Sequence, residues 1–198
     1  MRRLLLLRHA TTPAVRRSAF PLDEPLDAAG EASASALHGR LGRGDALSSP
    51  ALRARATATA AGLDAVAEPA LAECDFGSWA GRTLAEVWES EPADAEAWMT
   101  DPGAAPHGGE SLLALLERIG RWLDSQAARD GRCVAITHGG VVKAAVVHAL
   151  GADPLAFWRV DATPLHVTEL HGRDGRWTLA AANAPVVAAR ADAGRTAA

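Results

Sequence analysis

The stretch that decides the fold is LLLLRHA at residues 4–10, where four leucines end abruptly in an Arg-His pair. Four leucines are enough for a buried β-strand and too few for a membrane span. In an open α/β sheet, ligands bind beyond the carboxyl ends of the strands, which is where Arg8 and His9 would lie. The arginine suits carboxylate or phosphate, and the histidine can act as nucleophile or acid–base. Taken alone, the pair also fits a strand that ends in two solvated polar residues.

Composition places the chain among ordinary globular proteins. It has 198 residues, 48% of them hydrophobic and 22% charged, which fits one domain with a sizeable core. The net charge of −4 argues against a nucleic-acid or anionic-membrane partner. No run of about 18 apolar residues occurs, so we expect no transmembrane helix. Because Arg8 and His9 interrupt the short apolar run, we expect no signal peptide and a cytoplasmic location.

The two cysteines, Cys74 and Cys133, stand in neither a CxxC pair nor a zinc-binding spacing. Cys133 falls in a predicted buried strand, where cysteine behaves as a small hydrophobe. Cys74 falls in a loop. Since cytosolic thiols stay reduced, we expect no disulfide between them.

Strand and helix signals alternate along the chain. Strands are predicted at 4–7, 45–48, 65–68 and 132–137, with a hairpin of 166–171 and 176–179. Helices are predicted at 28–41, 50–61, 84–89, 93–99, 111–128 and 139–150. Asp27 and Ser49 are the expected N-caps of the first two helices. The alternation predicts an α/β protein, a single three-layer α/β/α domain over 1–187 with a mostly parallel central sheet. Residues 188–198 are expected to be a frayed tail.

Three predicted strand ends carry polar groups that should converge on one crevice. They are Arg8-His9, residues 48–50 and residues 137–140. Arg53 lies one turn into the helix after the second strand end, and a helix N-terminus with an arginine attracts anions. Two arginines, two histidines and a helix N-terminus predict a site for a dianion, most naturally a phosphoryl group.

Cleavage of a phosphate ester at this crevice needs a nucleophile and a proton donor. One histidine can attack phosphorus while the other histidine and both arginines hold the oxygens. An alkoxide leaving group still needs a proton. Glu73, just beyond a predicted strand, is the best candidate donor, and Asp75 is the second.

These segments resemble the histidine phosphatase superfamily, the phosphoglycerate-mutase-like phosphatases. The similarity runs in the family's order from residue 4 to about residue 150, and the hairpin also fits. The matching segments are 7–10 with Thr12, 25–30, 48–54 with 57–58, 71–79 with Gly81, 109–111 and 137–142. The length and the 109–111 segment look most like the small phosphatases of the α-ribazole-phosphate and broad-specificity type.

The resemblance implies a role for each matched position. His9 would be the nucleophile that becomes phosphohistidine. Arg8, Arg53 and His138 would bind the phosphoryl oxygens. Glu73 would protonate the leaving oxygen and then deprotonate the attacking water. No metal or organic cofactor is implied, and two arginines would repel a cation from a site built of His9, His138 and Glu73.

The leaving-group pocket is expected to come from the irregular segment 73–109, since so long an insertion is usually a functional lid or wall. Trp79 and His107 of this segment are candidate substrate-binding residues, together with Thr12 from an earlier loop, and Phe20 is a further candidate for the pocket wall. The other tryptophans are interpreted as core or interface residues.

The sequence departs from the family pattern at four positions. Thr11 and Ala80 stand where glutamate is common, Ala10 where glycine is usual and Val15 where many members place a phosphate-binding asparagine.

Sequence reasoning thus favours a metal-independent phosphomonoesterase acting on a small-molecule phosphate ester. Two alternatives stay open. One is a phosphomutase, which would pass the phosphoryl group to a second substrate instead of water. The other is a catalytically weak module that binds a phosphorylated ligand. A homodimer is also left open.

Overall fold

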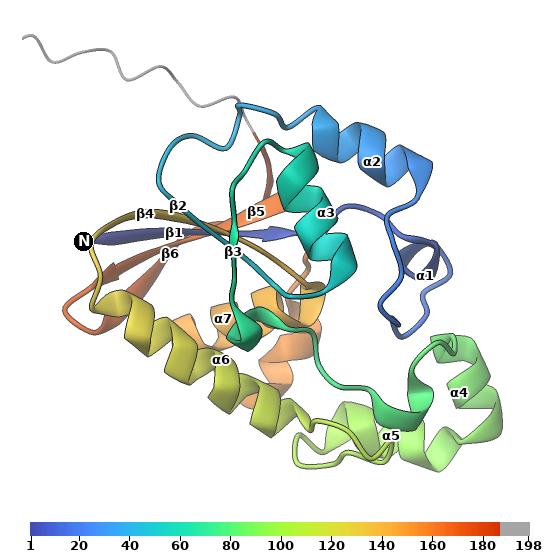
Figure 1. The fold of residues 1–198 in the computed structure, drawn as a ribbon. Helices are drawn as coiled ribbons and strands as arrows, with labels where there is room; N and C mark the ends of the chain where they lie inside the picture. Colours follow the sequence, from blue (N-terminus) through green and yellow to red (C-terminus); the bar gives the residue numbers. More distant parts are fainter. Residues whose placement is uncertain (187–198) are drawn as a thin grey trace, which may run out of the picture.

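The computed structural model describes residues 1–186, which form a six-stranded sheet in the order β3-β2-β4-β1-β5-β6 (Figure 1). The neighbours β3, β2, β4 and β1 are parallel, whereas β5 and β6 are antiparallel. The predicted α/β class with a mostly parallel sheet is therefore confirmed. The strands are β1 (Arg2–Arg8), β2 (Asp45–Ser48), β3 (Val66–Ala67), β4 (Gly131–Thr137), β5 (His166–Arg173) and β6 (Arg176–Pro185).

Helices cover both faces of the sheet. Figure 1 shows α2 and α3 on one face, α6 and α7 on the other, and α4 and α5 on the side towards which β1 points. The α-helices are α1 (Pro13–Arg16), α2 (Ala28–Ser35), α3 (Leu52–Ala60), α4 (Leu84–Ser90), α5 (Pro92–Thr100), α6 (Leu112–Ala127) and α7 (Gly139–Leu150). Three 3₁₀ helices are η1 (Pro69–Leu71), η2 (Gly77–Trp79) and η3 (Pro154–Arg159). None of the helices in the described part of the chain has the length and apolar character needed to cross a membrane.

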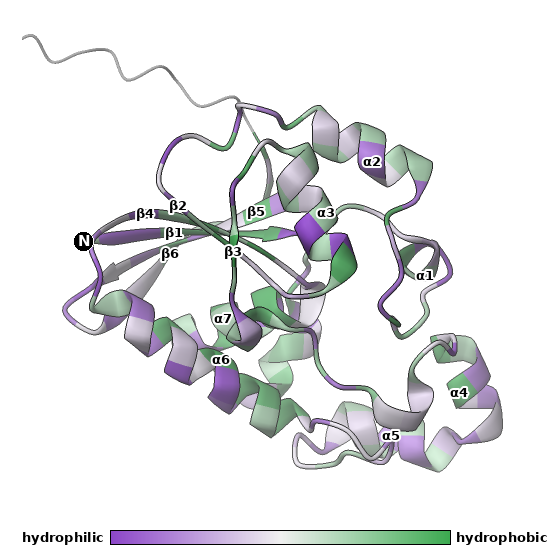
Figure 2. Ribbon diagram, in the orientation of Figure 1, coloured by the Kyte–Doolittle hydropathy of each residue, from purple (hydrophilic) through white to green (hydrophobic). Residues whose placement is uncertain are grey.

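The leucine run is uninterrupted because β1 is buried on both faces, as expected for a parallel strand at the centre of a sheet. Leu4 and Leu6 pack in the cluster formed with α6 and α7, and Leu5 and Leu7 pack in the cluster formed with α3. Full burial of one such side chain contributes about 1.5–3 kcal/mol. Figure 2 shows α6 with alternating purple and green bands, as expected for a helix with one buried face.

The predicted helix at 28–41 is wrong at its carboxyl end, because α2 stops at Ser35. Beyond it, the amide groups of Leu37 and His38 bond three residues back, and Gly39 has a positive φ of 72°. A left-handed residue cannot continue a helix. Leu37 still reaches the core through this tighter turn, which explains the apolar periodicity that suggested a longer helix.

The predicted N-cap Ser49 is also wrong, since α3 begins after Ala51, whose side chain makes no cap. The Ser49 hydroxyl bonds instead to His138, at 2.7 Å, and accepts the Ala51 amide. Asp23 accepts the Leu52 amide at 2.7 Å and caps the helix from a distant loop.

The segment expected to be a loop after His9 contains the short helix α1, with Thr12 as its N-cap and Pro13 in its first turn. Cys74 and Cys133 are both free thiols. The expected tail at residues 188–198 lies outside the described residues.

Candidate active site

The carboxyl ends of three parallel strands meet at one point. Arg8 ends β1 and lies opposite Thr137 at the end of β4, while Ser48 of β2 lies opposite Ile136. The next residue on each strand continues the ladder: the His9 amide donates to the Thr137 carbonyl at 2.8 Å, and the Ser49 amide donates to the Ile136 carbonyl at 2.9 Å. These backbone hydrogen bonds therefore fix the Cα positions from which the His9 and Ser49 side chains extend.

The ring of His9 is held in one tautomer by the backbone. Its Nδ1 bonds to the Ala10 carbonyl at 2.7 Å, and since a carbonyl only accepts, Nδ1 carries the proton. That leaves the lone pair on Nε2. Burial lowers the pKa of His9 to about 3, and the neighbouring cations Arg53 and Arg8 act in the same direction. The imidazole is therefore neutral at physiological pH, with Nε2 available for attack.

Two guanidinium groups flank His9. The Nε of Arg53 donates to His9 Nε2 at 3.2 Å, and its Nη1 donates to the Leu22 carbonyl at 2.7 Å. Arg8 donates to the Ala162 carbonyl at 2.6 Å, and its Nε is buried without a partner. Burial lowers the pKa of Arg8, which the Glu73 and Asp161 carboxylates oppose. Neither arginine forms an ion pair within residues 1–186, so both keep donors for an anion.

His138 approaches His9 from α7, where it is the N-cap residue. The two ring centroids lie 5.1 Å apart at 68°. His138 Nε2 bonds to the Ser49 hydroxyl at 2.7 Å, while its Nδ1 is buried without a partner. Burial holds the pKa of His138 well below its usual value, and the charge interaction with His9 adds to this. An orphaned buried polar atom costs about 1–3 kcal/mol, so a ligand that satisfies it gains that much.

Glu73 lies against the N-terminus of α7. Its carboxylate accepts the Cys74 amide at 3.0 Å and the Gly140 amide at 3.4 Å. A Cβ at position 140 would stand 2.3 Å from Glu73 Oε1, so this approach requires glycine. Glu73 and His9 line the same cavity, so the proposed acid and the proposed nucleophile share one space.

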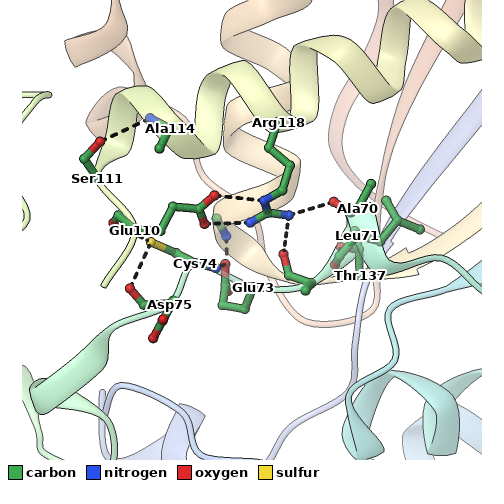
Figure 3. Close-up of polar contacts among 12 residues, drawn as sticks. Ala70, Leu71, Glu73, Cys74, Asp75, Glu110, Ser111, Ala114, Arg118 and Thr137 are labelled. Atoms are coloured by element: carbon green, nitrogen blue, oxygen red, sulfur yellow. Dashed lines mark hydrogen bonds and ion pairs between the residues drawn. The ribbon is translucent and has the colours of Figure 1, made fainter. Parts of the chain in front are cut away.

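Behind Glu73, the ion pair of Glu110 and Arg118 ties the loop to α6 (Figure 3). Arg118 donates to the two Glu110 oxygens at 2.8 and 2.7 Å, and to the carbonyls of Ala70 and Ala72 at 2.7 and 3.0 Å. The Thr137 hydroxyl donates to the Leu71 carbonyl at 2.9 Å from the end of β4. These contacts anchor residues 70–72, directly before Glu73.

Replacing Arg118 by methionine is expected to lower the free energy of unfolding by roughly 3 kcal/mol, because it strands Glu110 and two carbonyl groups without their donor. Urea unfolding measures the change. Arg121→Met is the matched control on the same helix, since Arg121 pairs with Glu117 in solvent. The control should change stability by at most about 0.5 kcal/mol. Equal losses in the two variants would contradict an anchoring role for Arg118.

Four of the candidate catalytic residues line a cavity of about 430 Å³. Arg8, His9, Arg53 and Glu73 form its polar end. The rest of the wall is largely apolar and is drawn from segments far apart in the sequence. Its large apolar members are Phe20, Phe76, Leu84, Trp98, Leu112, Leu115, Phe157 and Trp158. The arrangement suits a phosphorylated small molecule whose phosphoryl group lies deep and whose alcohol faces the aromatic wall.

Comparison with known proteins agrees with this geometry. A model of the histidine phosphatase superfamily (branch 1) matches residues 4–185. The chain belongs to the histidine phosphatase superfamily. Phosphoserine phosphatase 1 of Hydrogenobacter thermophilus is 30% identical over 188 residues, with 89% of each chain covered. A solved mycobacterial glucosyl-3-phosphoglycerate phosphatase complexed with VO3 has a TM-score of 0.82 at 28% identity, covering 93% of this chain and 100% of the other.

A bifunctional protein of Mycobacterium tuberculosis is 33% identical over 183 residues, which is 85% of this chain. The chain spans about half of that protein's length, 50%. The same share holds for two further mycobacterial relatives. Membership of the histidine phosphatase superfamily thus rests on the matched domain.

The three predicted substrate-binding residues do not line the cavity. Trp79 is fully buried behind Phe20, with its indole nitrogen donating to Glu91 at 2.8 Å. His107 is 2% exposed and packs edge-on against Trp79. Thr12 is fully buried and donates its hydroxyl to Glu24 at 3.0 Å. Their roles in substrate binding stay predictions, to which this cavity adds no support; Phe20 lines the cavity as expected.

Sequence reasoning missed several residues that do line the cavity. Trp98 and Trp158, interpreted as core or interface residues, face it and pack edge-on at 4.7 Å. Val15 presents an aliphatic side chain where many superfamily members have asparagine. Lys143 also lines it, and its spacing was a usable signal, since residues 139, 140 and 143 share one face of a helix.

Proposed function

We propose that the chain is a phosphomonoesterase that hydrolyses a small-molecule phosphate ester through a phosphohistidine intermediate. The observation that carries the proposal is the neutral His9, whose unprotonated Nε2 accepts from Arg53, flanked by two arginines that form no ion pair with a carboxylate within residues 1–186. A phosphoryl dianion would supply the missing counter-charge and accept hydrogen bonds from both guanidinium groups.

In the first step, His9 Nε2 attacks phosphorus and the bond between phosphorus and the ester oxygen breaks. Glu73 gives its proton to the leaving oxygen, which departs as an alcohol. In the second step, Glu73 takes a proton from water, whose oxygen attacks phosphorus and releases inorganic phosphate and free His9. Arg8, Arg53 and His138 hold the phosphoryl oxygens and stabilise the charge that develops on them.

The cavity supports a small substrate. Two relatives are named for phosphatases of phosphoserine and of glucosyl-3-phosphoglycerate, and the latter, from Mycolicibacterium vanbaalenii, is 34% identical over 179 residues, 81% of this chain and 79% of that protein. Both names describe small phosphate esters. We also propose a cytoplasmic location, in keeping with the two free thiols. A homodimer stays a prediction that light scattering tests.

Turnover with a panel of phosphate esters tests the proposed activity. Inorganic phosphate and free alcohol should be released in equal amounts, with p-nitrophenyl phosphate as a general substrate. Addition of a second alcohol should leave the phosphate yield unchanged. Transfer of the phosphoryl group to that alcohol would support the phosphomutase alternative. Binding of the esters without turnover would support the binding module.

Removal of divalent metal ions is expected to leave the activity unchanged, because two arginines and a histidine already supply positive charge at the phosphoryl site. In the described part of the chain, no three His, Cys, Asp or Glu side chains are grouped to hold a metal. Exhaustive dialysis against a chelator followed by assay checks this. An activity that is lost and then restored only by added Mg²⁺, Mn²⁺ or Zn²⁺ would overturn the mechanism.

A further inference from the structure

Lys143 is the only lysine of the sequence; the other cationic side chains are arginines. It lies on α7 and lines the cavity of the proposed active site. Its Nζ stands 5.4 Å from the centroid of the Phe157 ring. The ammonium group makes no ion pair or hydrogen bond with any described residue. The cavity thus contains a half-buried cation without a counter-ion.

The two carboxylates whose charges act on Lys143 accept hydrogen bonds from other groups. Burial lowers the pKa of Lys143 and Arg8 lowers it further, while Asp161 and Glu73 oppose this. The Asp161 carboxylate accepts the Ala162 amide at 2.8 Å and the Asn183 side-chain amide at 3.2 Å. Glu73 accepts two backbone amides. A half-buried cation whose one described contact is with an aromatic ring lacks a counter-ion, so this place favours an anion.

The side chains of Arg8, Glu73 and Lys143 lie at successive positions along the axis of α7. A phosphate ester presents its phosphoryl group, its ester oxygen and the carbon chain of its alcohol in the same order. A Cβ on Gly139 would lie 3.5 Å from the Arg8 guanidinium carbon, and Gly140 touches the Glu73 carboxylate. Lys143 comes one turn later, about 5.4 Å farther along the helix axis. A phosphoryl group at Arg8 and an ester oxygen at Glu73 would therefore direct the carbon chain of the alcohol towards Lys143.

We propose that Lys143 binds a carboxylate carried by the alcohol part of the substrate, a few bonds from the ester oxygen. Small phosphorylated carboxylic acids are then the preferred substrates. The inference rests on the proposed phosphatase function for its account of turnover. The binding it describes requires only that phosphoryl and carboxylate groups enter the cavity together.

Matched substrates test the preference. We compare 3-phosphoglycerate with glycerol phosphate, which has a hydroxymethyl group in place of the carboxylate. In the Lys143→Met variant, kcat/KM for 3-phosphoglycerate should fall roughly 10- to 100-fold, the usual effect of losing a hydrogen bond between charged groups. The value for glycerol phosphate should hardly change. Lys143→Arg, which keeps the charge, should retain much of the preference.

A binding measurement separates this inference from the proposed activity. Calorimetry compares two phosphonates that cannot be hydrolysed, 4-phosphonobutyrate and butylphosphonate. The natural chain should bind the carboxylated ligand more tightly, and Lys143→Met should remove the difference. If it does so while no ester is hydrolysed, the carboxylate site stands and the proposed function fails. Equal weakening of both ligands would mean that Lys143 binds the phosphoryl group, and no weakening of either would mean that it binds neither; both results overturn the proposal.

Discussion

Replacement of His9 by alanine is expected to lower the turnover of phosphate esters by roughly 10⁴–10⁶-fold, the range seen when a nucleophile is removed from an enzyme. The reason is that alanine removes the unprotonated Nε2, the proposed nucleophile, which lies beside Arg53 at 3.2 Å. The fold should persist, because the backbone amide of residue 9 keeps its bond to Thr137. Steady-state kinetics and circular dichroism measure the two effects. His38→Ala is the control, since His38 is exposed.

The intermediate gives a second readout for His9. Protein quenched during turnover of a labelled ester should carry label that is stable in base and lost in acid, as expected for phosphohistidine. Peptide mapping should place the label at residue 9. Label on another residue, or normal turnover in His9→Ala, would contradict the assignment.

Replacement of Glu73 by glutamine is expected to lower kcat/KM for alkyl phosphates by about 10²–10⁴-fold, the usual contribution of a placed proton donor. The loss with p-nitrophenyl phosphate should be distinctly smaller, because its leaving group departs without a proton. Glutamine keeps the size of the side chain, and its single carbonyl oxygen can accept one of the two amides, Cys74 or Gly140, that the two carboxylate oxygens accept. Any structural effect of the lost bond acts on both substrates alike. The ratio of the two substrates therefore reports proton transfer separately from structural change.

Asp75→Asn is the matched control for Glu73, because Asp75 lies only two residues away. Its carboxylate is exposed and accepts the Gly77 amide at 2.9 Å, and it is absent from the described lining of the cavity. The variant should leave both substrates nearly unaffected. An equal loss on alkyl and aryl esters in Glu73→Gln would exclude the acid role, and a leaving-group effect in Asp75→Asn alone would move that role to Asp75.

The sequence predicted best the residues whose location follows directly from where a strand begins and ends. The run 4–10 predicted a central strand because burial on both faces demands apolar residues at every position. Arg8, His9 and His138 could be placed at one edge because parallel strands end at the same edge. The helix predicted at 111–128 followed from its apolar periodicity, and the structure has it at Leu112–Ala127. The helix predicted at 139–150 followed from the glycines that come directly after a strand, and the structure has it at Gly139–Leu150.

The sequence was least informative where a distant residue decides the outcome. Ser49 has the right chemistry for an N-cap, but the structure uses it for His138 and caps the helix with Asp23. Trp79 and Phe20 are equally suitable for a pocket wall, and only packing shows that Phe20 stands in front. The local sequence pattern does not show which of two chemically suitable residues the folded chain places at a cap or in a cavity wall.

One side of the cavity wall is supported separately from Arg8 and His9. Phe20, Phe76 and Trp98 pack in a cluster apart from the sheet, whereas Phe157 and Trp158 pack in the cluster of β1, α6 and α7. Phe20, Trp79, Val87 and Ala95 form a hydrophobic cluster of their own, distinct from the two clusters that hold the sheet between its helices. Arg8 and His9 follow the central strand, whereas α4 and α5 belong to the separate cluster. Mutations in α4 and α5 can therefore reshape this side of the cavity while Arg8 and His9 keep their support. This division lets evolution alter the cavity wall at little risk to the end that holds Arg8 and His9, and it makes α4 and α5 the natural target for a library aimed at new substrates.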